Sequence, residues 1–244
     1  MLWKTRYGRC IYRGADDLAV YDNLYFRWLM LGGDALQTVL NKFAPYKPAL
    51  AYINPLICAA KADPGTTCML GLGGAGVAHA LSPVLNDKLL TAVELSNDVI
   101  STASRFFMLN KLANIEVIND DANLFVSSCT RQFKHLLIDL SNAYSFPANC
   151  NNAIFFENCQ RLLTADGVLA INIANWHEQR IFFEKLVSLF NNAIVCIPVK
   201  NCANIIFLAS NSKSPDPLLA MLENNSDVRQ LTWESNWGYV ATFK

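Results

Sequence analysis

The sequence predicts an α/β protein in which a doubly wound, mostly parallel sheet follows a small antiparallel β module. From residue 63 onward, short apolar segments alternate with segments of helical periodicity. These apolar segments lack polar alternation, which is typical of strands buried on both faces of a sheet. Before residue 63, the apolar runs are shorter and are separated by turn residues. We therefore expect a β module with a linking helix over residues 1–62 and an α/β domain over 63–244.

The N-terminal module is predicted from three β-type runs at 10–13, 18–22 and 25–31. Gly14 to Asp17 separate the first two runs, and Asp22-Asn23 separate the second and third; both are turn chemistry. A helical pattern at 48–60 follows the module. The sequence Asp63-Pro64-Gly65 then marks the boundary of the module.

The α/β domain contains seven candidate strands, which predict a seven-stranded sheet. They lie at 67–71, 89–95, 115–119, 135–140, 168–173, 193–198 and 205–210. A helix is expected at 98–110, where Val99, Ala103, Phe106 and Phe107 share one face. A polar loop, a short helix and a closing strand at 237–243 complete the domain.

The composition excludes several classes of protein. Lys and Arg together number 20, Asp and Glu together number 20, and hydrophobic residues make up 52% of the chain. A chain this apolar is able to bury a full core, which argues against intrinsic disorder. Balanced charge gives no long-range attraction to nucleic acid or an anionic membrane. The excess of apolar residues leads us to expect a homodimer.

The chain is predicted to be cytoplasmic and free of metal. No apolar run approaches the ~20 residues of a membrane span, and charges interrupt the start of the chain where a signal peptide is apolar. The eight cysteines form no C-x-x-C pair and no cluster with histidine, so we expect buried thiols in a reducing compartment. For His79, His135 and His177 we expect ordinary surface or capping roles.

A glycine-rich loop follows the first strand of the α/β domain and precedes a helix. It contains Gly71, Gly73, Gly74 and Gly76, whose missing side chains allow a tight turn and the close approach of a ligand. Glu94 ends the next strand, where a carboxylate accepts hydrogen bonds from ribose hydroxyls. Because the loop also fits the pattern G-x-G-x-x-G, a dinucleotide site is an alternative.

Acidic residues also follow the third and fourth strands of the predicted sheet. Asp120 and Asp121 come after the third strand, and Asp139 comes after the fourth. The carboxyl ends of parallel strands face one crevice, so these carboxylates and Glu94 should lie together. Three acidic strand ends suit a nucleoside with little phosphate. Asp121 is the candidate for the adenine amino group, and Asp120 for the N-cap of a helix beginning at Ala122.

The order of these motifs resembles the S-adenosylmethionine-dependent methyltransferase fold and, more narrowly, the spermidine synthase (polyamine aminopropyltransferase) family. The motifs are GLGGAG at 71–76, VEL at 93–95, NDDA at 119–122, IDLSN at 138–142 and LLTADGVLAIN at 162–172. The segment 27–37, which ends in Gln37, resembles the family's L-D-G-x-x-Q turn. Tyr52 with Pro55-Leu56 resembles its Y-x-E…P-L helix. The resemblance implies a Rossmann-like, methyltransferase-type sheet.

The resemblance also implies an activity. The family moves an aminopropyl group from decarboxylated S-adenosylmethionine to putrescine and leaves methylthioadenosine. The matching positions make Asp139 the general base, assisted by Tyr52. Glu94 matches the ribose carboxylate, the Asp121-Ala122 step matches the adenine contact, and Gln37 is a further donor-binding position.

Four positions depart from the family pattern. Gly74 replaces an aspartate that holds the donor's amine, Asn142 replaces the second aspartate of D-x-x-D, and Asn54 replaces the glutamate of Y-x-E. Lys200 aligns with a tyrosine near the amine. Lost carboxylates and an added cation predict weaker polyamine binding and make intact S-adenosylmethionine a possible donor. Alternatives are therefore a methyltransferase with a non-polyamine acceptor, a non-catalytic nucleoside-binding dimer scaffold, and an NAD-type oxidoreductase.

Overall fold

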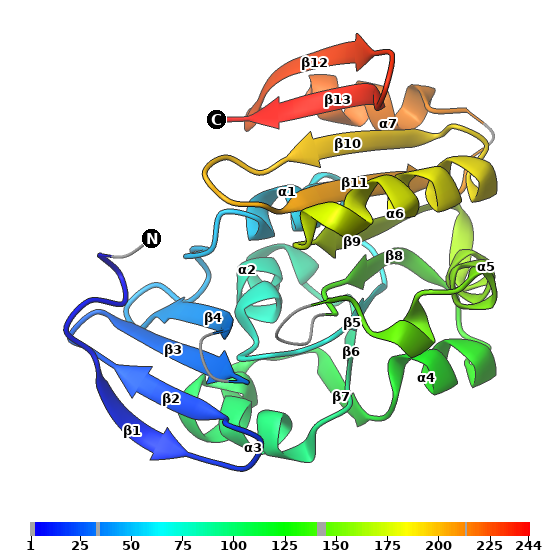
Figure 1. The fold of residues 1–244 in the computed structure, drawn as a ribbon. Helices are drawn as coiled ribbons and strands as arrows, with labels where there is room; N and C mark the ends of the chain where they lie inside the picture. Colours follow the sequence, from blue (N-terminus) through cyan, green and yellow to red (C-terminus); the bar gives the residue numbers. More distant parts are fainter. Residues whose placement is uncertain (1–2, 33–34, 141–144, 213) are drawn as a thin grey trace.

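The computed structural model describes residues 3–32, 35–140, 145–212 and 214–244. It contains a four-stranded sheet from the N-terminal part of the chain and a nine-stranded sheet from the remainder. Figure 1 shows the small sheet beside the glycine-loop end of the large one. The predicted combination of an antiparallel module and an α/β sheet is confirmed.

The small sheet is an antiparallel meander in the order β1-β2-β3-β4. Its turns fall where turn residues were predicted: Asp16 and Asp17 have positive φ, and the Asn23 carboxamide accepts the backbone N–H groups of Tyr25 and Phe26. The strands are β1 (Arg9–Arg13), β2 (Ala19–Asp22), β3 (Phe26–Leu31) and β4 (Ala35–Asn41).

The large sheet has the order β12-β13-β10-β11-β9-β8-β5-β6-β7. Strands β5 to β9 pair in parallel, whereas β11 is antiparallel to both of its neighbours. All seven predicted strands are present, and the predicted closing strand is β13. The prediction of seven strands in the sheet was wrong: β13 joins the sheet beside β10, and β12, which was not predicted, pairs with β13 to give nine. The strands are β5 (Thr67–Leu70), β6 (Leu90–Glu94), β7 (Ile115–Asn119), β8 (Phe133–Ile138), β9 (Leu163–Ile173), β10 (Ile194–Pro198), β11 (Ile205–Ser210), β12 (Val228–Glu234) and β13 (Gly238–Phe243).

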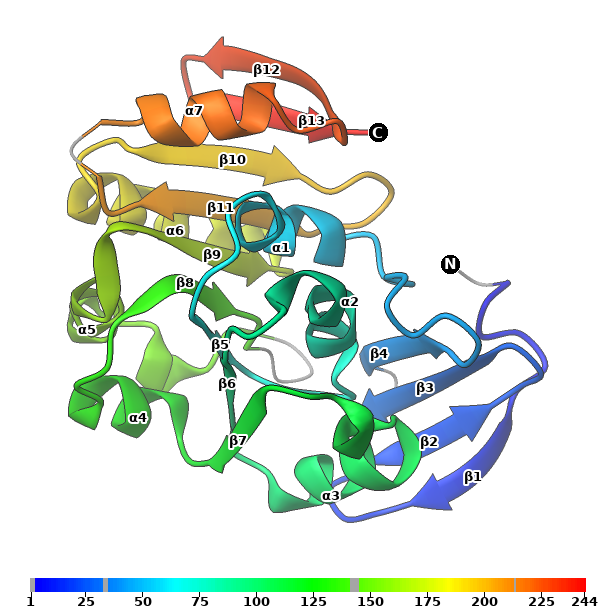
Figure 2. The ribbon, with the colours of Figure 1, turned by 180° about the vertical axis from the view of Figure 1, so that it is seen from behind.

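Helices cover both faces of the large sheet, as the doubly wound prediction requires. Figure 1 shows α4, α5 and α6 on one face, and Figure 2 shows α1, α2 and α7 on the other. Strand side chains alternate between the two cores: Met69 packs with one, and its neighbours Cys68 and Leu70 pack with the other. The helices are α1 (Ile53–Ala62), α2 (Gly76–Leu85), α3 (Asn97–Phe106), α4 (Ala122–Ser128), α5 (Ala153–Arg161), α6 (Trp176–Leu189) and α7 (Asp216–Glu223), with 3-10 turns η1 (Leu109–Lys111) and η2 (Ala148–Cys150).

Two predicted helices are shorter than the sequence pattern indicated. Helix α1 begins at Ile53 rather than at 48: Ala49 lies in a bend, and its carbonyl accepts a 2.7 Å hydrogen bond from Lys4 Nζ instead of a helical N–H. Helix α3 ends at Phe106, and Met108 has a φ of 57°, which a continuing right-handed helix does not permit. The division of the chain at residue 62 coincides with the end of α1 and stays a prediction.

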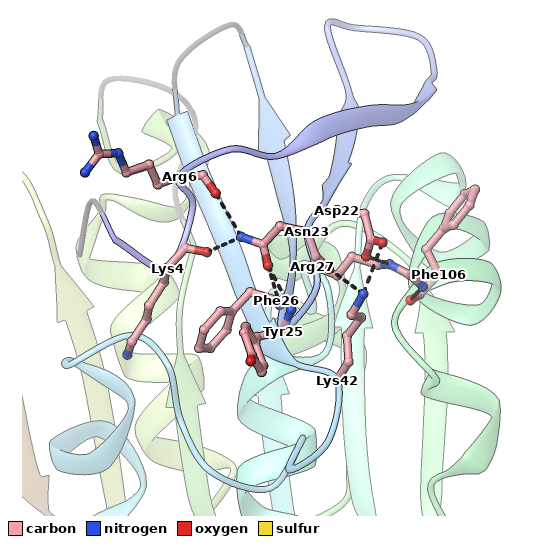
Figure 3. Close-up of polar contacts among 9 residues, drawn as sticks. All are labelled: Lys4, Arg6, Asp22, Asn23, Tyr25, Phe26, Arg27, Lys42 and Phe106. Atoms are coloured by element: carbon pink, nitrogen blue, oxygen red, sulfur yellow. Dashed lines mark hydrogen bonds and ion pairs between the residues drawn. The ribbon is translucent and has the colours of Figure 1, made fainter.

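The small sheet is fastened to the large domain at the end of α3. Arg27 on β3 donates from Nε to Asp22 Oδ1 at 2.9 Å and from Nη1 to the Phe106 carbonyl at 2.7 Å, as Figure 3 shows. The next carbonyl, that of Phe107, accepts a 2.7 Å hydrogen bond from His79 Nε2 on α2. These contacts hold the small sheet against the start of α2 and thereby bring β4 over the glycine loop.

Candidate active site

A cavity of about 310 Å³ lies at the carboxyl ends of β5 to β8 and is closed on one side by the small sheet. Among the described residues, its walls include seven of the residues predicted for the site: Gln37, Gly71, Gly73, Glu94, Asp121, Ala122 and Asp139. A second cavity of about 30 Å³ shares Gln37, Gly71, Gly73 and Asp139 with the first and is also lined by Tyr52 and Gly76. We call the larger space the main cavity and the smaller one the inner chamber.

The glycine loop forms the floor of the main cavity because two of its residues need positive φ. Gly71 has a φ of 90°, and a Cβ there would lie 2.4 Å from the Asp139 carbonyl oxygen. Gly73 has a φ of 51°. Only glycine adopts these conformations without strain, and the Gly71 position also forbids a side chain sterically. The loop therefore passes close to the end of β8 and places Asp139 beside the cavity.

Glu94 binds this loop through its carboxylate. Its Oε2 accepts the backbone N–H groups of Leu72 at 3.0 Å and Gly73 at 3.3 Å, and its Oε1 accepts that of Ser96 at 3.0 Å. A carboxylate has about four acceptor positions, and the two loop N–H groups together with that of Ser96 occupy most of this capacity. Glu94 thus shapes the cavity wall and retains room for about one further donor.

Asp121 is the N-cap of α4. Its Oδ1 accepts the backbone N–H groups of Asn123 and Leu124, and its Oδ2 accepts a 2.9 Å hydrogen bond from Asn149 Nδ2. Asp120 was the candidate for this cap on sequence grounds, and that prediction was wrong. Asp120 Oδ1 instead accepts the backbone N–H of Asp121, because Asp121 is the residue adjacent to the first helical position, Ala122. Both aspartates line the main cavity.

Tyr52 and Asp139 meet between the main cavity and the inner chamber. The Tyr52 hydroxyl donates to Asp139 Oδ2 at 2.9 Å. Burial raises the pKa of Asp139, and its hydrogen bonds with Asn172 and Tyr52 oppose that rise. Burial, reinforced by the neighbouring Asp139 carboxylate, raises the pKa of Tyr52 well above its usual value, so the phenol keeps its proton and remains the donor. The pair combines a carboxylate of increased basicity with a fixed hydroxyl.

Asn172 and Asn204 also belong to this site, although neither was predicted from the sequence. Asn172 Nδ2 donates to Asp139 Oδ1 at 2.8 Å, and Asn204 Nδ2 donates to Asn172 Oδ1 at 2.8 Å. Asn172 is only 7% exposed. The available signal was a polar side chain within the otherwise apolar end of β9, since buried polar groups are nearly always hydrogen-bonded.

Thr38 on β4 closes the space at Gly74. The Gly74 N–H donates to Thr38 Oγ1 at 2.8 Å, and a Cβ on Gly74 would lie 2.9 Å from Thr38 Cβ and 3.1 Å from Phe107 Cδ1. Gly74 lines neither the main cavity nor the inner chamber. An aspartate at this position has no room in the present packing.

The remaining candidates lie elsewhere or outside the described residues. Lys200 is exposed in the turn after β10 and lines neither cavity, and Asn54 is exposed on α1 and faces a separate cleft near α7. Asn142 is outside the described residues. His79 and His135 are buried, and burial lowers the pKa of both. The structure therefore brings neither Lys200 nor Asn54 to the predicted pocket.

The charge of the lining follows from these placements. Among the described residues, the main cavity and the inner chamber are lined by four carboxylates, those of Glu94, Asp120, Asp121 and Asp139, and by no Lys, Arg or His. Such a lining attracts cations and disfavours carboxylate ligands. The described residues contain no group of three side chains placed to hold a metal ion, and none of their helices has the length and apolarity of a membrane span.

Comparison with known proteins finds similarity to one enzyme family in both sequence and fold. No protein-family model matches the chain. A polyamine aminopropyltransferase of Neisseria meningitidis is 23% identical over 222 residues, which cover 88% of this chain and 83% of that protein. One from Chromobacterium violaceum is 25% identical over 190 residues, covering 75% of this chain and 72% of that protein.

The similar solved structures include spermidine synthases and a methyltransferase-like protein. A probable spermidine synthase from Corynebacterium glutamicum has a TM-score of 0.70 at 17% identity, covering 91% of this chain and 89% of that one. A spermidine synthase in complex with the transition-state analogue AdoDATO has a TM-score of 0.66 at 14% identity, covering 85% and 74%. Human methyltransferase-like protein 13 in complex with SAH has a TM-score of 0.60 at 13% identity, covering 71% and 89%.

Proposed function

We propose that this chain, a spermidine synthase-like transferase with a methyltransferase-type fold, transfers the aminopropyl group of decarboxylated S-adenosylmethionine to a polyamine such as putrescine. The observation that carries the proposal is the Tyr52–Asp139 pair at the junction of the main cavity and the inner chamber. A base at this junction faces both a bound nucleoside and an amine beside it.

The main cavity supports a nucleoside donor. Its volume of about 310 Å³ lies within the ~300–1,000 Å³ usual for small-molecule sites. We assign Glu94 to the ribose, Asp121 and Ala122 to the adenine, and Gln37 to the donor chain. Three backbone N–H groups already occupy most of the Glu94 acceptor positions, so Glu94 accepts a hydrogen bond from one ribose hydroxyl. It accepts a second only by giving up its longest hydrogen bond, the one from Gly73.

The acidic lining supports the decarboxylated form of the donor. This form carries a sulfonium and an ammonium group, whereas intact S-adenosylmethionine also carries a carboxylate. The four described carboxylates favour the two cations, and no described cation lines the cavities to receive a carboxylate. The expectation that intact S-adenosylmethionine is a possible donor rested on Gly74 and Lys200, and its support is removed because neither residue lines either cavity and Lys200 is exposed.

The reaction then needs one proton transfer and one substitution. Asp139 accepts a proton from the ammonium group of the acceptor, and the freed nitrogen lone pair attacks the aminopropyl carbon bonded to sulfur. A C–N bond forms while the C–S bond breaks, and its electrons neutralise the sulfonium to give methylthioadenosine. Tyr52 holds the carboxylate in place. General-base catalysis of this kind contributes ~10²–10⁴-fold to the rate.

We further propose that the protein acts as a cytoplasmic homodimer through the small sheet. Of the ten large apolar side chains that are more than half exposed among the described residues, five lie in the short N-terminal module: Trp3, Tyr7, Leu24, Tyr25 and Phe43. Exposed apolar side chains gathered on one part of a protein favour an interface. All eight cysteines are free thiols, consistent with a reducing compartment. Sedimentation of the wild type and a Tyr25→Ser, Phe43→Ser variant tests the dimer: we expect the variant to be monomeric.

Calorimetry tests the donor assignment. We expect methylthioadenosine and decarboxylated S-adenosylmethionine to bind more tightly than intact S-adenosylmethionine. Asp139→Asn should retain methylthioadenosine binding, because the amide has nearly the same shape, but should lose turnover with putrescine. Preference for the intact donor with methyl transfer would favour a methyltransferase instead. Binding of a nicotinamide dinucleotide in preference to methylthioadenosine would favour an oxidoreductase, and binding without any transfer would favour a scaffold.

A further inference from the structure

A chain of side-chain hydrogen bonds leads from the β10–β11 hairpin to the carboxylate of Asp139. Asn204 donates to Asn172 Oδ1, and Asn172 donates to Asp139 Oδ1, each at 2.8 Å. The hairpin itself is held in place: the Asn204 carbonyl accepts the backbone N–H of Val199 at 2.9 Å, and Gln179 Nε2 on α6 donates to the Ala203 carbonyl at 2.6 Å. A residue outside both cavities is thus connected to the proposed base.

The direction of these bonds determines which form of Asp139 is favoured. A carboxamide has one acceptor oxygen and one donor nitrogen, and turning it end over end exchanges them. In the observed orientation Asn172 presents its NH₂ group to Asp139, which stabilises the ionised carboxylate. The reversed orientation would present Asn172 Oδ1, which favours a protonated carboxyl group.

Asn204 favours the first of these two orientations. Its NH₂ group satisfies Asn172 Oδ1, which is buried and would otherwise lack this donor. Without Asn204, the observed orientation leaves Asn172 Oδ1 without its hydrogen-bond donor. The reversed orientation of the Asn172 carboxamide then becomes similar in free energy whenever Asp139 is protonated. Asn204 therefore acts on the base without touching it.

We propose that Asn204 is a positioning residue that holds Asn172 with its NH₂ group toward Asp139 and so keeps this carboxylate ready to accept a proton. The proposal deepens the proposed function and rests on it for the role of Asp139 as base. Among the described residues, the titratable groups around Asp139 are Tyr52 from the start of α1, and Glu94, Asp120, Asp121 and Cys150 in the wall of the main cavity. None of them is altered by a change at residue 204, so comparison of variants isolates the effect of the carboxamide chain.

Direct titration of Asp139 by ¹³C NMR tests the proposal without requiring activity. The carboxyl resonance is assigned by its loss in Asp139→Asn. We expect Asn172→Ala to raise the titration midpoint by about one pH unit or more, since it removes a hydrogen bond to a charged group. Asn204→Ala should raise it by a smaller amount. Asn204→Leu, which keeps about the size of the side chain, removes its donor and adds no charge, should raise it about as much as Asn204→Ala.

Asn201→Gly is the matched control. It removes an asparagine side chain from the same hairpin, at an exposed position with a φ of 61° that glycine adopts freely. We expect it to titrate as the wild type does. A wild-type midpoint in both Asn204 variants overturns the proposal. If the Asn204 variants raise the titration midpoint of Asp139 but leave the acid limb of the pH profile of kcat/KM unchanged, Asn204 has the positioning role but Asp139 is not the base. A failure of this proposal is therefore distinguishable from a failure of the proposed function.

Discussion

Glu94→Gln tests whether Glu94 holds the glycine loop and binds the nucleoside, or is only a surface carboxylate beside a glycine-rich turn. Glu94 accepts three backbone N–H groups, from Leu72, Gly73 and Ser96. A glutamine has one acceptor oxygen instead of two. When that oxygen is placed on Leu72 and Gly73, the NH₂ group faces the N–H of Ser96, and two donors then oppose each other.

The expected cost follows from the number of bonds lost. One hydrogen bond to a charged group is worth about 1.5–3 kcal/mol. For a chain of this size, 1 kcal/mol corresponds to about 2–4 °C, so the midpoint of thermal unfolding should fall by about 3–12 °C. The affinity for methylthioadenosine should fall by about 10- to 150-fold if the same free energy is lost on binding.

Thermal unfolding and calorimetry with methylthioadenosine measure the two effects. Glu116→Gln on the adjacent strand is the control, because Glu116 pairs with Arg131 where both side chains are about two-fifths exposed. Exposed pairs contribute roughly 0.2–1 kcal/mol, and Glu116 lies outside both cavities. A Glu94→Gln variant that melts and binds as the control does would refute the reasoning.

Three further predictions follow from buried groups and from the placement of substituted positions. Burial lowers the pKa of His79 and His135, so below about pH 6.5 the unfolded chain binds protons that the folded protein does not. The free energy of unfolding, measured in urea, should therefore fall below about pH 6.5, by at most about 1.4 kcal/mol per pH unit per histidine. A free energy of unfolding that stays constant in this window would contradict the prediction. Gly74→Asp should lower stability by roughly 1–3 kcal/mol without improving putrescine turnover, because its Cβ would collide with Thr38; an unchanged melting temperature would contradict this packing. Asn54→Glu should leave the KM for putrescine unchanged, since Asn54 faces a different cleft, and a lowered KM would place it in the site after all.

The parts of the site that depend on the order of strands could be predicted from the sequence. Tyr52 and Asp139 are 87 residues apart, and the family resemblance paired them before any geometry was available. Glu94 and the glycine loop were predicted together because the carboxyl ends of adjacent parallel strands must face one crevice. These predictions used topology, which apolar periodicity and short motifs reveal well.

The parts that depend on side-chain packing could not be predicted. Nothing in the sequence pattern places Thr38 against Gly74, or joins Asn204 to Asn172, because each contact sets a loop residue against a strand and depends on the geometry of that loop. The same limitation affected Lys200, whose motif alignment suggested a pocket residue while the turn after β10 leaves it exposed. The sequence alone does not show which positions line the cavities, so it could not reveal that Gly74, Asn54 and Lys200 lie outside both of them.

The acidic lining and the Tyr52–Asp139 pair lead to one central claim, that the chain transfers an aminopropyl group to an amine. Mass spectrometry of the products formed by the purified protein from decarboxylated S-adenosylmethionine and putrescine tests it most directly. The account predicts methylthioadenosine and spermidine in equal amounts from the wild type, and neither from Asp139→Asn. Wild-type protein that binds methylthioadenosine but forms neither product, or an Asp139→Asn variant that forms both at the wild-type rate, would contradict it.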